Sequence, residues 1–184
     1  PVYTDFSDEL TDSVDVDLPG TTPGMNWDRF VGKATAHLRE HDGHVAVQKL
    51  RRNKQLTSTD LAEFERMLYG LGAEQTHIDR AVREAGGLGL FLRSLVGLDR
   101  NAVVEAFSRF LNTTEHSVDQ IRFIEMVINE LTSTGVMEPS RLFESPYSDD
   151  FPRVDYIFVD HEVEFIVNTL RDVRANAVPS EKTA

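Results

Sequence analysis

Hydrophobic side chains recur every three or four positions from residue 26 onward, which is the spacing of one face of an α-helix. The first stripe predicts a helix that buries Trp27, Phe30, Val31, Ala34 and Leu38. Similar stripes predict helices over residues 45–50, 57–71, 78–85, 90–96, 103–111, 121–131, 139–143 and 163–173. Because the connections between them are short, we expect an all-α, irregular multi-helix domain of about eight or nine short helices.

Several of these helices carry start and stop signals. Thr57 is expected to cap the helix that follows it, with Asp60 near the positive end of that helix. Ser117 followed by Gln120 has the spacing of a capping box. Gly135 is placed to end the helix that this box begins.

The two ends of the chain differ from the helical part. Residues 1–24 contain six acidic residues and no Lys or Arg, which favours an acidic linker or extended segment. The alternation of Val14, Val16 and Leu18 with acids leaves one short edge strand as an alternative. We expect the helical domain over residues 25–176, an irregular stretch over 145–160 and a flexible tail over 177–184.

Composition narrows the class of protein. The chain has 184 residues with 31 Asp and Glu against 19 Lys and Arg, so its formal net charge is -12 at pH 7. This charge argues against a free-standing nucleic-acid binder, because DNA phosphates attract clustered positive charge. There is no cysteine, no secretory signal and no apolar run long enough to span a membrane, so we expect a cytoplasmic location. The start at Pro1, without an initiator Met, suggests a piece of a longer protein.

Nucleotide-binding motifs are weak. Gly32-Lys33 lacks the Ser or Thr that follows Lys in a phosphate-binding loop, and it lies inside a predicted helix. Gly86-Gly87-Leu88-Gly89 follows no strand and is better interpreted as a turn between helices.

Metal and acid–base chemistry are also weakly indicated. His37 and His41 share a helix face and His44 follows, but no Glu adjoins the first histidine as zinc hydrolases require. We expect a solvated helix end there and no metal site. Asp149-Asp150 has no recognisable pocket, and Asp160 is expected as a helix cap with Glu162 in the first turn. An independent hydrolase built on these groups therefore stays a minor alternative.

One concentrated basic feature stands out in this acidic chain, namely the run of Lys49, Arg51, Arg52 and Lys54. Such a run could contact phosphates or the acids of another subunit. Ion pairs within the chain, or plain solvation, are the simpler alternative.

A set of motifs resembles the C-terminal helical domain of type I restriction enzyme R (motor and endonuclease) subunits of the EcoEI-like class. They are LRSLVGLDR at 92–100, AF at 106–107, FL at 110–111, QIRFI at 120–124, GVM at 135–137, LFESPY at 142–147 and QKLRRN at 48–53. The resemblance covers residues 26–176 and departs from the family pattern at residues 153–158, where a Gly followed by Leu-Phe is expected.

The resemblance implies a parent protein that is a type I site-specific, ATP-dependent deoxyribonuclease and DNA translocase using ATP and Mg²⁺. It implies no catalytic residue and no cofactor in the present chain. The resemblance further implies that the present chain docks the motor onto the modification (methyltransferase) and specificity subunits. DNA would be contacted through the full complex. Arg93 and Arg100 match the motif and are interpreted as packing or interface residues, and Asp99 as a helix cap. An alternative function is direct DNA contact through the basic run.

Overall fold

The computed structural model describes residues 24–113, 115–144 and 152–179. In these ranges the chain forms helices and no strand, which confirms the all-α prediction. The elements are α2 (Trp27–Glu40), α3 (Val45–Arg51), α4 (Ser58–Gly70), α5 (Gln75–Ala85), α6 (Leu88–Val96), α7 (Arg100–Thr113), α8 (Val118–Thr134), the 3-10 helix η1 (Pro139–Phe143), α9 (Val154–Ile157) and α10 (Asp160–Asn176). The predicted acidic linker, its alternative edge strand and Asp149-Asp150 lie outside the described residues.

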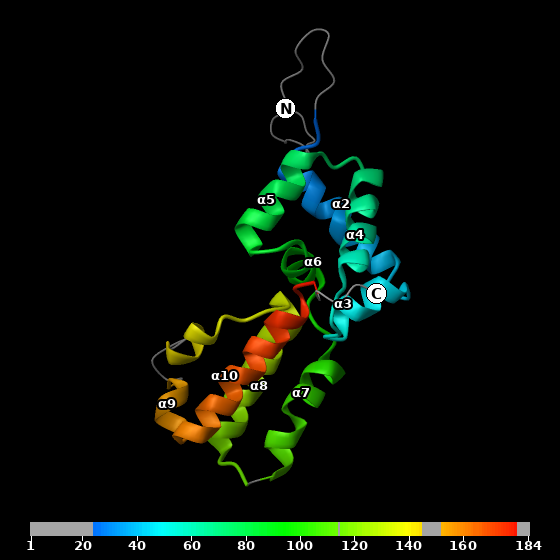
Figure 1. The fold of residues 1–184 in the computed structure, drawn as a ribbon. Coiled ribbons are helices and arrows are strands. Elements are labelled where there is room, and N and C mark those ends of the chain that lie inside the picture. Colours follow the sequence, from blue (N-terminus) through cyan, green and yellow to red (C-terminus); the bar gives the residue numbers. More distant parts are fainter. Residues whose placement is uncertain (1–23, 114, 145–151, 180–184) are drawn as a thin grey trace.

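The helices are arranged in two lobes that meet at a narrow waist (Figure 1). The N-terminal lobe comprises α2 to α6, and its core includes Phe30, Leu38, Phe64 and Phe91. The C-terminal lobe comprises α7 to α10 with η1, and its core includes Phe107, Phe123, Leu131, Ile166 and Leu170. Within the described ranges, no helix is both long enough and apolar enough to cross a bilayer.

Local sequence signals explain where the helices begin and end. The Thr57 hydroxyl accepts from the Asp60 amide at 3.1 Å, and the Asp60 carboxylate accepts from the Thr57 amide at 2.9 Å. Ser117 and Gln120 form the same reciprocal pair at the start of α8. Gly135 ends α8 with a left-handed φ of 81°, a conformation that glycine adopts without strain. These predicted caps are confirmed.

Two predictions in the last third of the chain are wrong. Residues 154–157 form the short helix α9 inside the stretch expected to be irregular. Asp160 does not cap α10 but is its first residue, because Val159 occupies the cap position. The Val159 amide, a donor at the start of the helix, donates to the Glu162 carboxylate at 3.0 Å. Glu162, and not Asp160, therefore satisfies this amide.

The last described residues pack against the N-terminal lobe. Ala177 is buried, and the Gln55 side-chain amide donates to the Val178 carbonyl at 2.6 Å. The Leu56 amide donates to the Asn176 carbonyl at 3.1 Å. The chain beyond α10 therefore returns to the waist and adds contacts between the lobes.

Backbone contacts at the waist are very close. A Cβ atom on Gly97 would overlap the Thr132 carbonyl of α8, and one on Gly135 would overlap the Arg93 backbone of α6. The Asp99 amide also donates to the Arg51 carbonyl at the end of α3, at 2.7 Å. Only glycine permits this approach of α6 to α8, so the two lobes are fixed together by backbone as well as by side chains.

Candidate functional site

The four cations of the basic run do not form one surface patch, because Lys49 forms an ion pair within the domain. Its Nζ lies 3.1 Å from the Asp60 carboxylate, which is itself only 6% exposed and caps α4. Burial would raise the pKa of Asp60, but hydrogen bonds from Thr57 and Lys49 outweigh that effect and hold the pKa below its usual value. Lys49 therefore holds the start of α4 onto α3.

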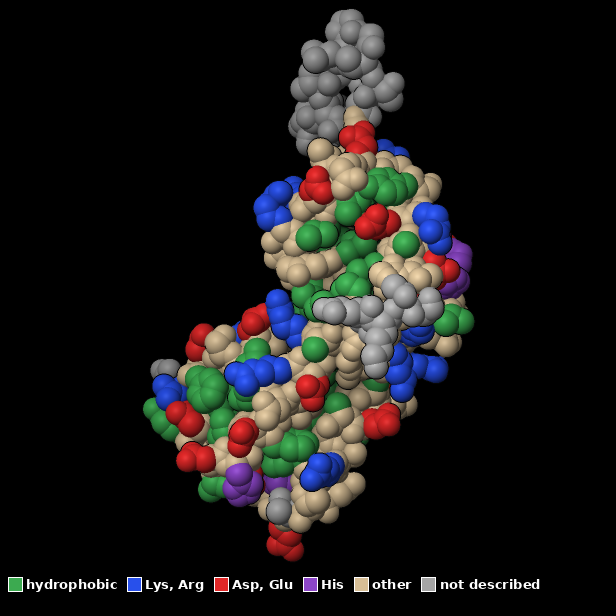
Figure 2. Space-filling view, in the orientation of Figure 1, with side chains coloured by type: hydrophobic (Ala, Val, Ile, Leu, Met, Phe, Trp, Pro, Cys, Tyr) green, Lys and Arg blue, Asp and Glu red, His purple; other side chains and the backbone are tan. Residues whose placement is uncertain are grey.

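The remaining residues of the run lie at the C-terminal end of α3. Arg52 and Lys54 are exposed and Arg51 is half-buried. None of the three has a carboxylate oxygen within 4 Å among the residues that the structure describes. Figure 2 shows Lys and Arg side chains gathered on both sides of the waist on the visible face. The run thus leaves three cations available to a partner.

Arg93 is buried and cannot contact DNA or a partner in this structure. Its side chain is 0% exposed, with Nε donating to the Leu50 carbonyl at 3.0 Å and one terminal nitrogen donating to the Val173 carbonyl at 2.8 Å. These carbonyls end α3 and α10, where the helix dipole is negative. Burial lowers the pKa of Arg93 to about 10, so it stays charged at neutral pH. Of the two roles that the resemblance left open, burial favours packing.

Arg100 is exposed at the start of α7, and one terminal nitrogen donates to the Asn129 side-chain oxygen of α8 at 3.0 Å. Asp99 precedes this helix, and its backbone carbonyl accepts from the amides of Ala102 and Val103. The two residues thus start α7 and link it to α8. Arg100 keeps a solvent-facing position and stays a candidate contact.

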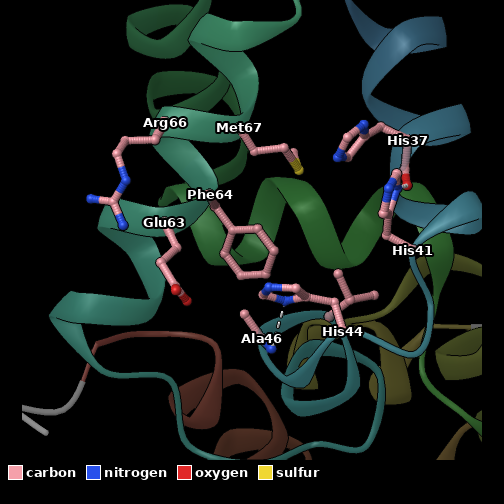
Figure 3. Close-up of a pocket in the computed structure, with 9 residues that line it drawn as sticks. His37, His41, His44, Ala46, Glu63, Phe64, Arg66 and Met67 are labelled. Atoms are coloured by element: carbon pink, nitrogen blue, oxygen red, sulfur yellow. Dashed lines mark hydrogen bonds between the residues drawn. The ribbon is translucent and has the colours of Figure 1, made fainter.

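The three histidines line a pocket of about 330 Å³ between α2, α3 and α4 (Figure 3). The rings of His37 and His41 stack with their centroids 4.1 Å apart, and His44 accepts from the Ala46 amide at 3.2 Å. Phe64 and Met67 of α4 form the apolar side, and Met67 points toward His37 in Figure 3. Burial, and then the neighbouring charge of His41, lowers the pKa of His37.

This pocket is not arranged as a metal centre. In the described ranges, no three His, Asp or Glu side chains are grouped so that they could hold a metal ion. The His41 Nδ1 is already 3.0 Å from the His37 carbonyl, and the His44 Nδ1 serves as the cap of α3. The imidazoles thus have structural uses at the junction of α2 and α3.

The remaining weak motifs are also accounted for by the fold. Lys33 donates from Nζ to the Leu71 carbonyl at 3.1 Å, which ties α2 to the end of α4. Gly86 ends α5 with a left-handed φ of 89° and Gly87 caps α6, so these two glycines form the predicted turn, whereas Leu88 and Gly89 already belong to α6. His161 lies exposed on α10 beside a pocket that also includes Glu162 and Arg109.

Sequence reasoning missed a second hollow, which joins Arg39 to the basic run. It has a volume of about 300 Å³ and is lined by Leu38, Arg39, Asp42, Arg51 and Val96. We call it the Arg39–Arg51 notch. The sequence signal was the short connection between α2 and α3, which brings the last turn of one helix close to the next.

Comparison with known protein families gives one result that covers most of the chain. Residues 28–174 match the family model described as EcoEI R protein C-terminal. No curated protein and no solved structure matches the chain. The matched range contains all but the first residue of α2, all of α3 to α9 and nearly all of α10, together with the motifs on which the resemblance rested. The chain therefore belongs to the EcoEI R protein C-terminal family, that is, to the C-terminal domains of type I restriction enzyme R subunits.

Proposed function

We propose that this chain is a non-catalytic assembly domain that docks a type I restriction R subunit onto its methyltransferase and specificity subunits. The observation that carries the proposal is the family match over residues 28–174, which assigns the chain to the C-terminal part of such a subunit. In this account the ATP, the Mg²⁺, the translocation and the DNA cleavage belong to the rest of a cytoplasmic R subunit.

The architecture supports a docking role. The close backbone contacts at Gly97 and Gly135 hold the lobes together, so the domain can present a surface of fixed shape. Polar groups that could have served chemistry have internal partners instead, as the Lys49–Asp60 ion pair illustrates. His77 is a further example, because its Nε2 lies 2.6 Å from the carbonyl oxygen of Met25, just before the start of α2.

Deletion in the parent subunit tests the proposal. An R subunit lacking residues 26–176 should fail to co-purify with the methyltransferase–specificity complex, while its ATP-binding lobes stay folded. The 184-residue chain alone should show neither ATPase nor nuclease activity. Full assembly and DNA cleavage by the deletion variant would overturn the proposal.

A second candidate function is DNA contact through the basic run. The observation in its favour is that Arg52 and Lys54 are exposed and have no carboxylate oxygen of the described residues within 4 Å. The pairing of Lys49 with Asp60 weakens it, because one of the four cations is already neutralised. Binding of the chain to duplex DNA that weakens steeply with salt, and that Arg52→Glu/Lys54→Glu abolishes, would favour this function.

A further inference from the structure

The Arg39–Arg51 notch is lined by two arginines from different helices. Arg39 comes from the last turn of α2 and Arg51 from the last residue of α3. Leu38 and Val96 supply an apolar wall, and Asp42 from the connecting turn lies at the same hollow. The notch is therefore a small, basic and partly apolar cavity at the waist.

The two arginines of the notch have no carboxylate partner among the residues that the structure describes. Neither has a carboxylate oxygen within 4 Å anywhere in the described ranges, although Asp42 lines the same cavity. The Arg51 Nε is buried and makes no hydrogen bond. A buried donor without an acceptor is unfavourable. Arg51 as a whole is half-buried, so its charge has lost part of its hydration, and an anion from another molecule would compensate that charge.

The shape and charge of the molecule distinguish between two kinds of acceptor. The planar guanidinium fork fits either a carboxylate or a phosphate. A DNA duplex would bring a long row of charges toward a chain with a net charge of -12, so repulsion would act beyond the notch. A single acidic side chain brings one charge, and the apolar wall of Leu38 and Val96 fits the carbon atoms of such a side chain.

We infer that the Arg39–Arg51 notch is a socket for an Asp or Glu side chain of a partner protein. This inference rests on the proposed docking function and names the chemistry of one contact in it. Asp42 is the competing charge, because it also lines the notch and its negative charge repels an incoming carboxylate. Removing the charge of Asp42 should therefore strengthen the contact between the two arginines and the partner's carboxylate.

The experiment uses the full R subunit and its purified methyltransferase–specificity complex. Arg39→Gln/Arg51→Gln should weaken binding by at least about tenfold, as expected when one side of a charged contact is removed. Arg39→Gln alone, at an exposed position, should weaken it less, and Asp42→Asn should strengthen it. Arg83→Gln is the matched control and should bind like the wild type, since Arg83 is exposed on α5 and forms no ion pair with another described residue.

The outcomes separate the inference from the function on which it rests. If the notch variants bind normally while deletion of residues 26–176 abolishes binding, the socket is wrong and the docking function stands. If the deletion variant binds normally, the docking function itself is wrong. If the notch variants lose DNA affinity but keep protein affinity, the acceptor is a phosphate and the inference is overturned. Circular dichroism of each variant must match the wild type, and the exposed Arg39→Gln variant decides the case if the double variant unfolds.

Discussion

The two lobes use arginine differently. In the C-terminal lobe Arg141 pairs with Glu130, and Arg174 pairs with Glu138 at 2.5 Å. Both pairs connect the segment around η1 to a long helix, so the charges hold the lobe together. In the N-terminal lobe Arg80 pairs with Glu84 only within its own helix, and Arg39 and Arg51 line one notch with no carboxylate oxygen within 4 Å among the described residues. The paired arginines of the C-terminal lobe hold its segments together, and in our proposal the two notch arginines contact a partner.

Arg93 lies between the lobes and follows neither pattern. It is buried like a core residue, yet it donates to carbonyls at the ends of α3 in one lobe and α10 in the other. Two negative helix ends accept hydrogen bonds from its guanidinium, and the end of α8 lies against its backbone at Gly135. Among the described residues Arg93 has no carboxylate partner, and its second terminal nitrogen is buried without an acceptor. The dipoles of α3 and α10 replace part of the hydration that its charge has lost.

The largest expected effect comes from removing this link. Arg93→Ala should lower the free energy of unfolding by about 3–5 kcal/mol, because it leaves a cavity and two carbonyls without donors. Trp27, the one tryptophan of the chain, packs against Phe91 and reports on the N-terminal lobe. In the wild type, its fluorescence and the far-ultraviolet circular dichroism should change in one transition.

In Arg93→Ala the two signals should separate, because the lobes lose their shared contact. Arg83→Ala is the control, and it should stay within about 0.5 kcal/mol of the wild type. Coincident transitions in Arg93→Ala with unchanged stability would show that the lobes are not linked through this side chain.

The next largest effect is expected where the backbone after α6 lies against that of α8 at the waist. Gly97→Ala should lower the free energy of unfolding by about 1–3 kcal/mol, because the new Cβ meets the Thr132 carbonyl and the φ of 71° disfavours alanine. Gly32→Ala on α2 should have the opposite sign and stabilise by about 0.5–1 kcal/mol. Nothing lies within 4 Å of a Cβ at that position. Thermal unfolding of both variants measures the difference, and an equal effect at the two sites would argue against the contact.

A smaller effect is confined to the N-terminal lobe and depends on pH. Asp60→Asn should cost about 1 kcal/mol at neutral pH, because the capping carboxylate also pairs with Lys49. The pKa of Asp60 is lowered by folding, so its stabilisation is present above the usual pKa of 3.8 and is lost as the pH falls below it. Urea unfolding should therefore show a stability difference that disappears in acid. A difference that persists at the lowest pH would contradict the assignment.

The smallest effect concerns an exposed ion pair. Arg80 and Glu84 lie 2.9 Å apart on α5, with both side chains largely in solvent. Glu84→Gln should change the free energy of unfolding by no more than about 0.5 kcal/mol, and less at high salt. Chemical denaturation at low and high salt checks this. A larger loss would mean that the pair has a structural role that its exposure does not suggest.

Much of the fold could be predicted from local sequence. Thr57, Ser117 and Gly135 mark helix ends through groups within four residues, so their roles follow from spacing alone. The apolar run of α6 predicted a buried helix but gave no sign that Arg93 is buried with it. Its partners Leu50 and Val173 are distant in sequence, and only tertiary packing brings them together.

The candidate site was predicted only in part for the same reason. Four neighbouring cations suggested one basic patch, but Lys49 forms an ion pair with Asp60, the residue that caps α4. Arg51 instead lines a cavity together with Arg39 of the preceding helix. The α9 helix was missed because four residues carry too little periodicity to be recognised. Contacts between residues far apart in the sequence therefore could not be predicted, and neither could a helix of only four residues.

The most direct test of the docking function is the binding of the 184-residue chain to the purified methyltransferase–specificity complex, measured by titration calorimetry. The account predicts saturable binding to that complex, weakened by Arg39→Gln/Arg51→Gln, and no comparable affinity of the chain for duplex DNA. Failure to bind the complex, together with tight salt-dependent binding to DNA alone, would contradict it.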